Sequence, residues 1–119
     1  MYRGDLMQYS DGSNEVFSGY YTSRPGLKKN VKVASALLHA QNKLFAKEVL
    51  RQEANDTEVK EILQAKSKVL DALGILNAHN SISGGANEIV VRDFNARLKT
   101  ALDASSPVYN RLVASEVRR

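Results

Sequence analysis

The sequence contains no cysteine and no tryptophan, and it has only two proline and two histidine residues. Without cysteine, the fold can contain neither a disulfide framework nor a metal site built on thiolates. Long apolar runs are also missing, because no stretch approaches the roughly 18 residues that a membrane-spanning helix requires. The first residues lack a basic start followed by an apolar run, so no signal peptide is recognisable. An ordinary hydrophobic core must therefore hold this chain together.

The residues that are present fit one globular domain, since 119 residues with 43% hydrophobic and 25% charged side chains can bury a modest core. The net charge of +4 raises the question of a nucleic-acid partner, because a basic face releases counterions from phosphates. Lys and Arg are interleaved with Asp and Glu, however, and the basic clusters at 28–32 and 118–119 are short. Such mixed charge is typical of solvated helix surfaces, so we expect no nucleic-acid partner. A nucleic-acid-binding bundle remains the weakest alternative.

Residues 1–26 differ in composition from the rest of the chain, because they combine most of the aromatic residues with four glycines. Aromatic residues spread among glycines do not favour a helix, so we expect an extended, irregular segment whose rings pack on a surface. That surface need not lie within this chain. The residues concerned are Tyr2, Gly4, Tyr9, Gly12, Phe17, Gly19, Tyr20, Tyr21 and Gly26.

From residue 27 onward, apolar residues recur at three- and four-residue spacing, which indicates the faces of helices. We expect a first helix over about 28–51 and a second that begins after Asn55, where Glu58 occupies the capping-box position. The second helix should end near His79. Gly74 interrupts it at a cost of about 1 kcal/mol relative to Ala, which suggests close packing of another backbone or a weak point. The expected stripes are Val31, Ala34, Leu37, Leu38, Leu44, Phe45 and Val49, then Val59, Ile62, Leu63, Lys66, Val69, Leu70, Leu73 and Leu76.

A third helix is expected over about 87–104, after two consecutive glycines. Ser106 followed by Pro107 resembles a cap with proline at the first helical position, so a short helical piece should begin there. The apolar residues of this part are Val90, Phe94, Leu98, Ala101, Leu102, Val108, Leu112 and Val113. Three amphipathic helices with short loops predict an all-α fold, in which residues 27–119 form an antiparallel three-helix bundle.

The segment LGILNAHNSISGG, residues 73–85, contains the best candidate site in the sequence. His79 and Asn80 stand at the expected end of a helix, beside the hydroxyls of Ser81 and Ser83. A histidine there can simply interact with the negative end of the helix dipole, or it can ligate a metal. Catalytic zinc takes about three protein ligands, whereas the only other histidine, His39, lies on a different expected helix. If His79 binds a metal, the remaining ligands must come from elsewhere.

A second candidate is the segment GYYTSRP, residues 19–25. In one interpretation it is a loop that enters the first helix, with Pro25 fixing the turn and Arg24 pairing with a carboxylate. In the other, the rings of Tyr20 and Tyr21 form part of a sugar-binding wall, because ring faces stack on the apolar faces of sugars.

Taken together, GYYTSRP and LGILNAHNSISG resemble the middle region of glycoside hydrolase family 38, the alpha-mannosidases, from residue 4 to about residue 98. The pair Asp11-Gly12 and the three residues Gly26-Leu27-Lys28 resemble the lysosomal branch of the family. The resemblance implies that residues 1–119 are the middle domain of a zinc-dependent, retaining enzyme that removes terminal alpha-mannosyl residues from glycans. It implies that His79 is a ligand of the catalytic zinc and that Asn80 occupies the position of a substrate-binding Asp. Ala78 and Gly85 replace a His and a Thr of the family pattern.

The resemblance also implies which parts lie outside this chain. The other zinc ligands and the catalytic carboxylate pair belong to an N-terminal alpha/beta domain of the same protein, and beta domains follow, so no catalytic residue can be assigned here. The isolated chain should be inactive and should bind zinc weakly. The partners implied are those domains and a mannose-containing glycan, in the lysosome or the secretory pathway. The alternative is a stand-alone helical protein-interaction module with the Tyr-rich N-terminus as its binding arm and Met1 as a true start.

Overall fold

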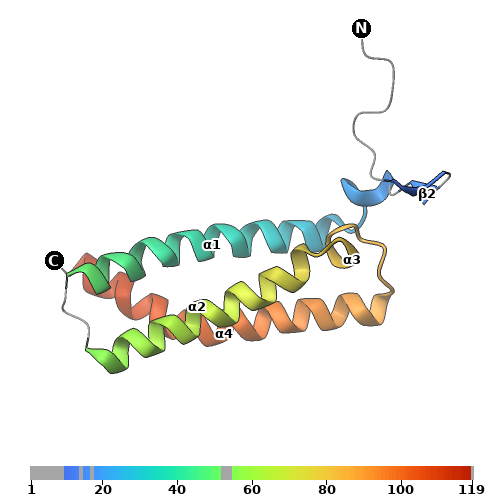
Figure 1. The fold of residues 1–119 in the computed structure, drawn as a ribbon. Coiled ribbons are helices and arrows are strands. Elements are labelled where there is room, and N and C mark those ends of the chain that lie inside the picture. Colours follow the sequence, from blue (N-terminus) through green and yellow to red (C-terminus); the bar gives the residue numbers. More distant parts are fainter. Residues whose placement is uncertain (1–9, 14, 17, 52–54, 119) are drawn as a thin grey trace, which may run out of the picture.

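Three long helices form the body of the molecule in the computed structural model, which describes residues 10–13, 15–16, 18–51 and 55–118. The helices are α1 (Pro25–Leu50), α2 (Asp56–Asn77) and α4 (Glu88–Val117), and the short helix α3 (His79–Ile82) lies between the last two (Figure 1). Each long helix packs against the other two, and α2 runs in the opposite direction to α1 and α4. The predicted all-α, antiparallel three-helix bundle is therefore confirmed.

The helices begin at the signals that the sequence carries. Pro25 is at the start of α1, three residues before the predicted beginning. The capping box of α2 is present: the Asn55 side chain accepts hydrogen bonds from the backbone N–H groups of Thr57 and Glu58, and the Glu58 carboxylate accepts one from the Asn55 N–H. These side chains satisfy amide groups that have no partner inside the helix.

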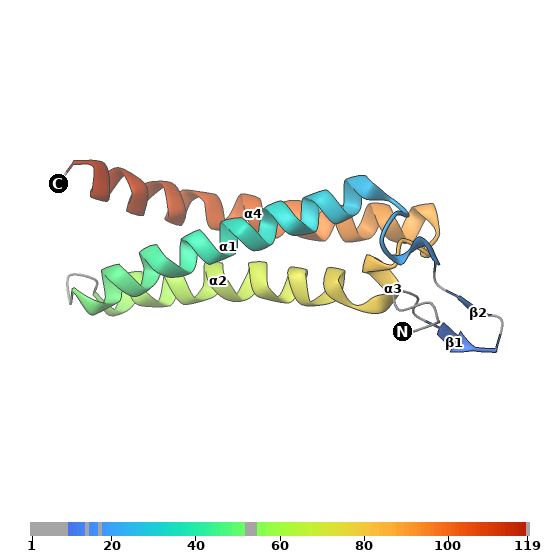
Figure 2. The same ribbon diagram turned by 90° about the horizontal axis from the view of Figure 1, so that it is seen from above.

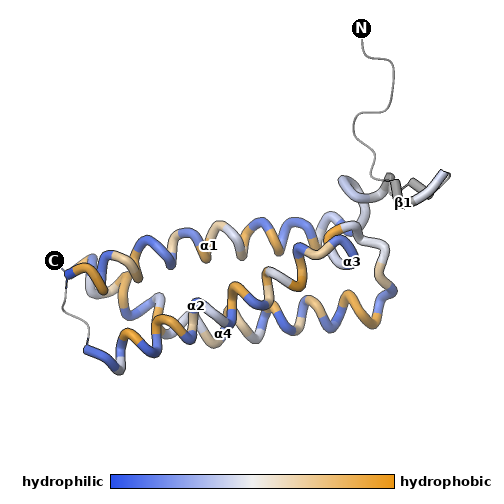
Figure 3. The backbone as a smooth tube through the Cα atoms, viewed as in Figure 1, coloured by the Kyte–Doolittle hydropathy of each residue, from blue (hydrophilic) through white to orange (hydrophobic). Residues whose placement is uncertain are grey.

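The core is divided along the bundle into two apolar clusters. Figure 3 shows apolar positions recurring along each long helix between hydrophilic ones, as expected for helices that bury one face. The smaller cluster consists of Phe45, Ile62 and Leu112, near the connection between α1 and α2. The larger cluster consists of Leu27, Val31, Ala34, Leu38, Val69, Ala72, Leu73, Leu76, Val91, Leu98 and Ala101.

Some apolar residues that were predicted to lie on the buried faces of α2 and α4 are exposed. Leu63 and Leu70 of α2 are 56% and 52% exposed, so the predicted α2 face was too wide. At the start of α4, Val91 is buried and Val90 is 38% exposed, which is the reverse of the prediction. Adjacent helical residues point in directions about 100° apart around the axis, so Val90 and Val91 cannot both face the core, and in the packed helix it is Val91 that does.

Pro107 does not begin a separate helix, contrary to the prediction. The segment after residue 106 is helical as expected, but it continues α4, which contains Pro107 in its interior. The hydroxyls of Ser105 and Ser106 both donate to the Leu102 carbonyl at the turn that proline disturbs. Beyond it, Leu112 is buried in the smaller apolar cluster. Tertiary packing of the last turns therefore outweighs the local preference of proline to start a helix.

Gly74 has no close neighbour among the described residues. A Cβ atom built on it would meet nothing within 4 Å, and the residue is exposed in the middle of α2. The prediction that another backbone packs closely on Gly74 is therefore wrong for this part of the chain. The other interpretation, a locally weak point in the helix, stays a prediction.

The N-terminal region contains short extended pieces in place of a long helix, as its composition predicts. Strands β1 (Ser10–Gly12) and β2 (Glu15–Val16) form a two-stranded antiparallel sheet, and the 3-10 turn η1 (Ser18–Tyr20) follows. The rings of Tyr20 and Tyr21 meet edge to face at a centroid distance of 5.4 Å. The other aromatic residues of this region, Tyr2, Tyr9 and Phe17, lie outside the described residues.

Both views place the small sheet, η1, α3 and the beginning of α4 at the same end of the bundle (Figures 1 and 2). The opposite end holds the end of α1 and the beginning of α2. None of the described helices is long and apolar enough to cross a membrane. Both sequence segments singled out as candidate sites therefore lie at one end of the molecule.

Candidate functional site

The two candidate segments are in direct contact, at Ser23 and Gly84. Gly84 has a φ of 75°, in the region that favours glycine. A Cβ atom on Gly84 would lie 2.7 Å from the Ser23 Cβ atom and 2.8 Å from the Ser23 carbonyl oxygen. A glycine is therefore required for two reasons, its backbone conformation and the close approach of Ser23.

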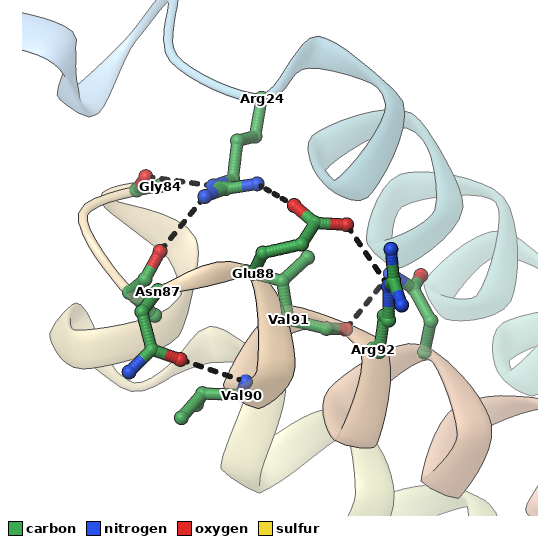
Figure 4. A network of polar contacts seen from close by, with 9 residues as sticks. Arg24, Gly84, Asn87, Glu88, Val90, Val91 and Arg92 are labelled. Atoms are coloured by element: carbon green, nitrogen blue, oxygen red, sulfur yellow. Dashed lines mark hydrogen bonds and ion pairs between the residues drawn. The ribbon is translucent and has the colours of Figure 1, made fainter.

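Arg24 connects the same two segments through its side chain. Its guanidinium donates to the carbonyl of Gly84 at 3.1 Å, to the carbonyl of Ala86 at 2.9 Å and to the Glu88 carboxylate at 2.9 Å (Figure 4). The predicted pairing of Arg24 with a carboxylate is therefore confirmed. Glu88 also pairs with Arg92 one turn later in α4. Hydrogen bonds from Arg24, and then from Arg92, hold the pKa of the Glu88 carboxyl below its usual value.

The backbone of Arg24 is in an unusual conformation for its position. Its φ of 50° and ψ of 60° are left-handed, and it is the one residue other than glycine with a positive φ in the part of the chain that the structure describes. A residue before proline normally adopts an extended conformation. A non-glycine residue held in such a region costs of order 1–3 kcal/mol and persists where its surroundings fix it.

Lys28, one helical turn after Arg24, is a further connection that the sequence interpretation missed. Its ammonium donates to the Ser23 carbonyl and, at 2.7 Å, to the Ile82 carbonyl at the end of α3. Partial burial lowers the pKa of the Lys28 ammonium. A signal for this role was present in the sequence, because residues four apart on a helix lie on the same face.

His79 begins a new helix, whereas the sequence placed it at the end of the preceding one. Helix α2 ends at Asn77, and Ala78 has an extended ψ of 145°, which breaks the helical path. The Ala78 carbonyl then accepts from the amides of Ser81 and Ile82, which starts α3. His79 and Asn80 therefore stand in the first turn of a short helix, and both residues are exposed.

An open hollow of about 390 Å³ lies beside these two residues. It combines an imidazole, two amides and a hydroxyl with apolar side chains contributed by α4, an arrangement suited to a small polar ligand that also has an apolar face. Both Ser81 and Ser83 are buried, and of the two only Ser83 lines the hollow. The lining residues are His79, Asn80, Ser83, Gly85, Ala86, Asn87, Val90 and Phe94. Tyr20 and Tyr21 are not among them.

Among the described residues that line the hollow, His79 is the one side chain of a common metal-binding type, so these residues do not form a complete metal site. No group of three or more His, Cys, Asp or Glu side chains comes together among the described residues. His39 lines a different hollow, between α1 and α2, together with Asn77. An exposed imidazole can donate a nitrogen to zinc, but zinc takes about three protein ligands in catalytic sites. This part of the chain can therefore contribute to a zinc site that other residues complete.

Comparisons with known proteins identify the same family that the segments at residues 19–25 and 73–85 resemble. Residues 15–115 match the family described as the alpha mannosidase middle domain. Alpha-mannosidase F of Dictyostelium discoideum is 35% identical over 116 residues, which are 96% of this chain and 11% of that protein. A probable alpha-mannosidase of Arabidopsis thaliana is 33% identical over 94 residues, 79% of this chain and 8% of that protein.

A third relative, the lysosomal alpha-mannosidase of Dictyostelium discoideum, is 27% identical over 113 residues, which are 93% of this chain and 11% of that protein. The chain thus spans between 8% and 11% of the length of these three relatives. No solved structure matches the chain.

Proposed function

Since this chain belongs to the family of alpha-mannosidase middle domains, we propose that it is part of a zinc-dependent, retaining alpha-mannosidase that hydrolyses terminal alpha-mannosyl residues of glycans. In this proposal the chain completes an active site that is built mainly by other domains. Its own contribution is His79, as one zinc ligand, with Asn80 beside it as a substrate-binding residue.

The observation that carries the proposal is the exposed position of His79, at the end of the bundle where Ser23, Arg24 and Lys28 contact the segment after α2. His79 borders an open hollow, and the connection that follows it is fixed by contacts from Ser23, Arg24 and Lys28. A ligand that is held in place but faces outward is suited to a metal shared with a second domain, because little freedom is lost when the metal binds.

The side chain of Asn80 is suited to form hydrogen bonds with a sugar. The carboxamide both donates and accepts hydrogen bonds, and it is exposed at the same hollow. The family resemblance places an Asp at this position, and a carboxylate accepts stronger hydrogen bonds from hydroxyl groups. We therefore expect Asn80→Asp in the full-length enzyme to raise kcat/KM by several-fold without changing the zinc content. A fall in kcat/KM would contradict a role of Asn80 at the sugar.

Hydrolysis with retention requires two carboxyl groups about 5 Å apart, one as nucleophile and one as acid and base. None of the described residues that line the hollow beside His79 has a carboxyl group, so in this proposal both groups come from the absent domain. When bound, zinc would supply a Lewis acid that holds hydroxyl groups of the sugar. The residues of this chain then orient that centre: His79 holds one coordination position, and Asn80 exchanges hydrogen bonds with the substrate.

The deciding experiment compares two histidine variants of the full-length enzyme. His79→Ala should lose zinc affinity by a factor of about 100 or more, and hydrolysis of a nitrophenyl alpha-mannoside should fall with it. His39→Ala is the matched control, because His39 is also an exposed helical histidine but lies outside this hollow. Normal zinc content in His79→Ala would overturn the proposal.

The isolated chain provides a second test. It should show no hydrolysis of the same mannoside and only weak zinc binding, since one ligand does not hold the metal. Calorimetric titration measures the zinc affinity. A sub-micromolar affinity that disappears in His79→Ala would show that the chain builds a complete site by itself.

The partners in this proposal are the other domains of the same enzyme and a mannose-containing glycan. The length of the relatives supports the first, because this chain spans at most 11% of the three described above. The compartment that we propose is the lysosome or the secretory pathway, and one relative is named a lysosomal enzyme. Fractionation of cells expressing the tagged full-length protein would locate it.

A further inference from the structure

The conformation of Arg24 indicates a role beyond connecting two segments. Its left-handed backbone, directly before a proline, is unfavourable by itself. Such a residue persists where the surrounding structure fixes it, and strained positions of this kind cluster at functional sites. Arg24 directly precedes α1, at the end of the bundle that carries α3, and α3 begins at His79.

The guanidinium of Arg24 holds the connection between α3 and α4 on both sides of Gly85. It donates to the carbonyl before Gly85, that of Gly84, and to the carbonyl after it, that of Ala86. The third bond is to Glu88, in the first turn of α4 (Figure 4). A planar fork with several fixed donors can satisfy these three acceptors together, whereas the single ammonium of a lysine cannot do so with the same geometry.

Backbone hydrogen bonds extend this fixed geometry to His79. The Gly84 amide donates to the Ser81 carbonyl at 3.0 Å, and the Ser83 amide donates to the His79 carbonyl at 3.3 Å. Gly84 therefore continues the turn that contains His79. On the other side, Ala86 and its neighbour Asn87 line the hollow. One side chain thus fixes both the α3 wall and the α4 wall of the hollow.

We propose that Arg24 is a positioning residue for the zinc site, which holds His79 and the opposite wall of the hollow in the geometry that binds the metal productively. This inference rests on the proposed function, since it assigns a role toward the zinc that His79 would ligate. Arg24 itself does not line the hollow. Its effect is therefore transmitted through the carbonyls of Gly84 and Ala86.

The test uses Arg24→Lys in the full-length enzyme, because lysine keeps the positive charge and a long side chain. The melting temperature should stay near that of the wild type, while zinc affinity falls by about tenfold and kcat at saturating zinc falls by a similar factor, with little change in KM. Replacing zinc by Co²⁺ should shift the visible absorption bands of the variant, because the ligand geometry changes. Arg24→Gly relieves the backbone conformation but removes the fork, so its zinc affinity should also fall.

The matched control is Arg97→Lys, which changes an exposed ion pair with Asp93 on the same bundle. It should leave zinc affinity, kcat and the Co²⁺ spectrum unchanged. If His79→Ala loses zinc while Arg24→Lys keeps wild-type affinity, kcat and spectrum, the Arg24 inference is wrong and the proposed function stands. If His79→Ala keeps its zinc, the proposed function is wrong and the inference falls with it. Should Arg24→Gly fail to fold, the lysine variant alone decides.

Discussion

At the residue scale, two glycines of the same region have opposite structural meanings. Gly74 is exposed in α2 and its Cβ position is open, whereas Gly84 has a positive φ and lies against Ser23. A sequence shows both only as glycines. The consequence of adding a methyl group therefore depends on backbone conformation and on neighbours that are distant in sequence.

Gly74→Ala should stabilise the 119-residue chain. Alanine fits the helical backbone, meets no neighbour within 4 Å and removes flexibility from the unfolded chain, so the free energy of unfolding should rise by about 1 kcal/mol. Urea denaturation followed by circular dichroism measures the change. Gly84→Ala is the opposite case and should lower the free energy of unfolding by about 2 kcal/mol. Equal effects of the two substitutions would contradict this contrast.

Glu88 should make the stability depend on pH in the acid range. Its pKa is lowered in the folded state, so the carboxylate stabilises the fold above its usual pKa, and this contribution is lost as the pH falls through the folded value. The free energy of unfolding should therefore decline more steeply between about pH 5 and pH 3 in the wild type than in Glu88→Gln. Parallel curves for the two proteins would show that the ion pairs of Glu88 have no influence on stability.

The sequence predicted some of these residues and missed others for a physical reason. The interpretation of residues 19–25 as a loop that enters the first helix included a pairing of Arg24 with a carboxylate. Its bonds to the Gly84 and Ala86 carbonyls were not predictable, since they depend on which loop lies opposite. The same holds for the bond from Lys28 to Ile82, across 54 residues.

At the element scale, α4 shows how tertiary contacts override a local signal. Ser106 and Pro107 have the pattern of a helix start, yet the helix passes through them without a break. Proline has no backbone N–H, so Pro107 cannot donate to the carbonyl of Asp103, four positions earlier. Local patterns predict helical content well, but whether two helical pieces join depends on the surface on which they pack.

Pro107→Ala should stabilise α4. Alanine restores the missing backbone donor, and because Pro107 is exposed, little packing is lost. The free energy of unfolding should rise by about 2 kcal/mol, toward the known difference between proline and alanine inside a helix. Chemical denaturation at equilibrium measures this, and amide exchange at residues 104–106 and 108, which have an N–H in both proteins, should slow in parallel. A destabilised variant would indicate that the turn needs the fixed backbone of proline.

The break between α2 and α3 is a second case at this scale. The periodicity of residues 59–76 predicted the second helix and its end within two residues, but not the short helix that begins at His79. Nothing in the residue types of Asn77 and Ala78 requires an extended ψ there. The next segment contacts Ser23 and Lys28, and only the folded chain brings these residues together.

At the scale of the whole molecule, a buried polar pair separates the two apolar clusters. Gln41 and Ser105 are both fully buried, and the Gln41 amide donates to the Ser105 hydroxyl at 3.1 Å. This hydroxyl donates in turn to the Leu102 carbonyl. Gln41 follows the larger cluster along α1, and Phe45 of the smaller cluster comes one turn later. A buried polar pair at this level favours the observed register of α1 against α4.

Ser105→Ala should therefore lower the free energy of unfolding by about 1–3 kcal/mol, because the buried Gln41 amide loses its acceptor. Ser106→Ala is the matched control, since that neighbouring hydroxyl bonds only to the Leu102 carbonyl and the residue is half-buried. It should change the stability by less than about 0.5 kcal/mol. Thermal denaturation of both variants measures the difference, and equal losses would contradict a special role of the buried pair.

The sequence predicted more of the fold than of the candidate site. Three stripes with apolar spacing specify three helices that must bury them together, so the bundle follows from the chain itself. The candidate site involves His79 and Asn80, but a complete zinc centre is not present among the described residues. In the proposed function the other zinc ligands belong to other domains, and this sequence spans about a tenth of the length of its relatives.

The distance along the chain between Arg24 and Gly84 has a consequence for folding kinetics. The two residues are 60 positions apart, so their contact closes a loop that contains α1, α2 and α3. Closing so long a loop costs entropy, so we expect this contact to form after the transition state. Arg24→Ala, which removes all three hydrogen bonds of the guanidinium, should therefore accelerate unfolding of the 119-residue chain and leave the folding rate nearly unchanged in stopped-flow measurements. The end of the bundle that carries His79 would then be the last part to form and the first to open.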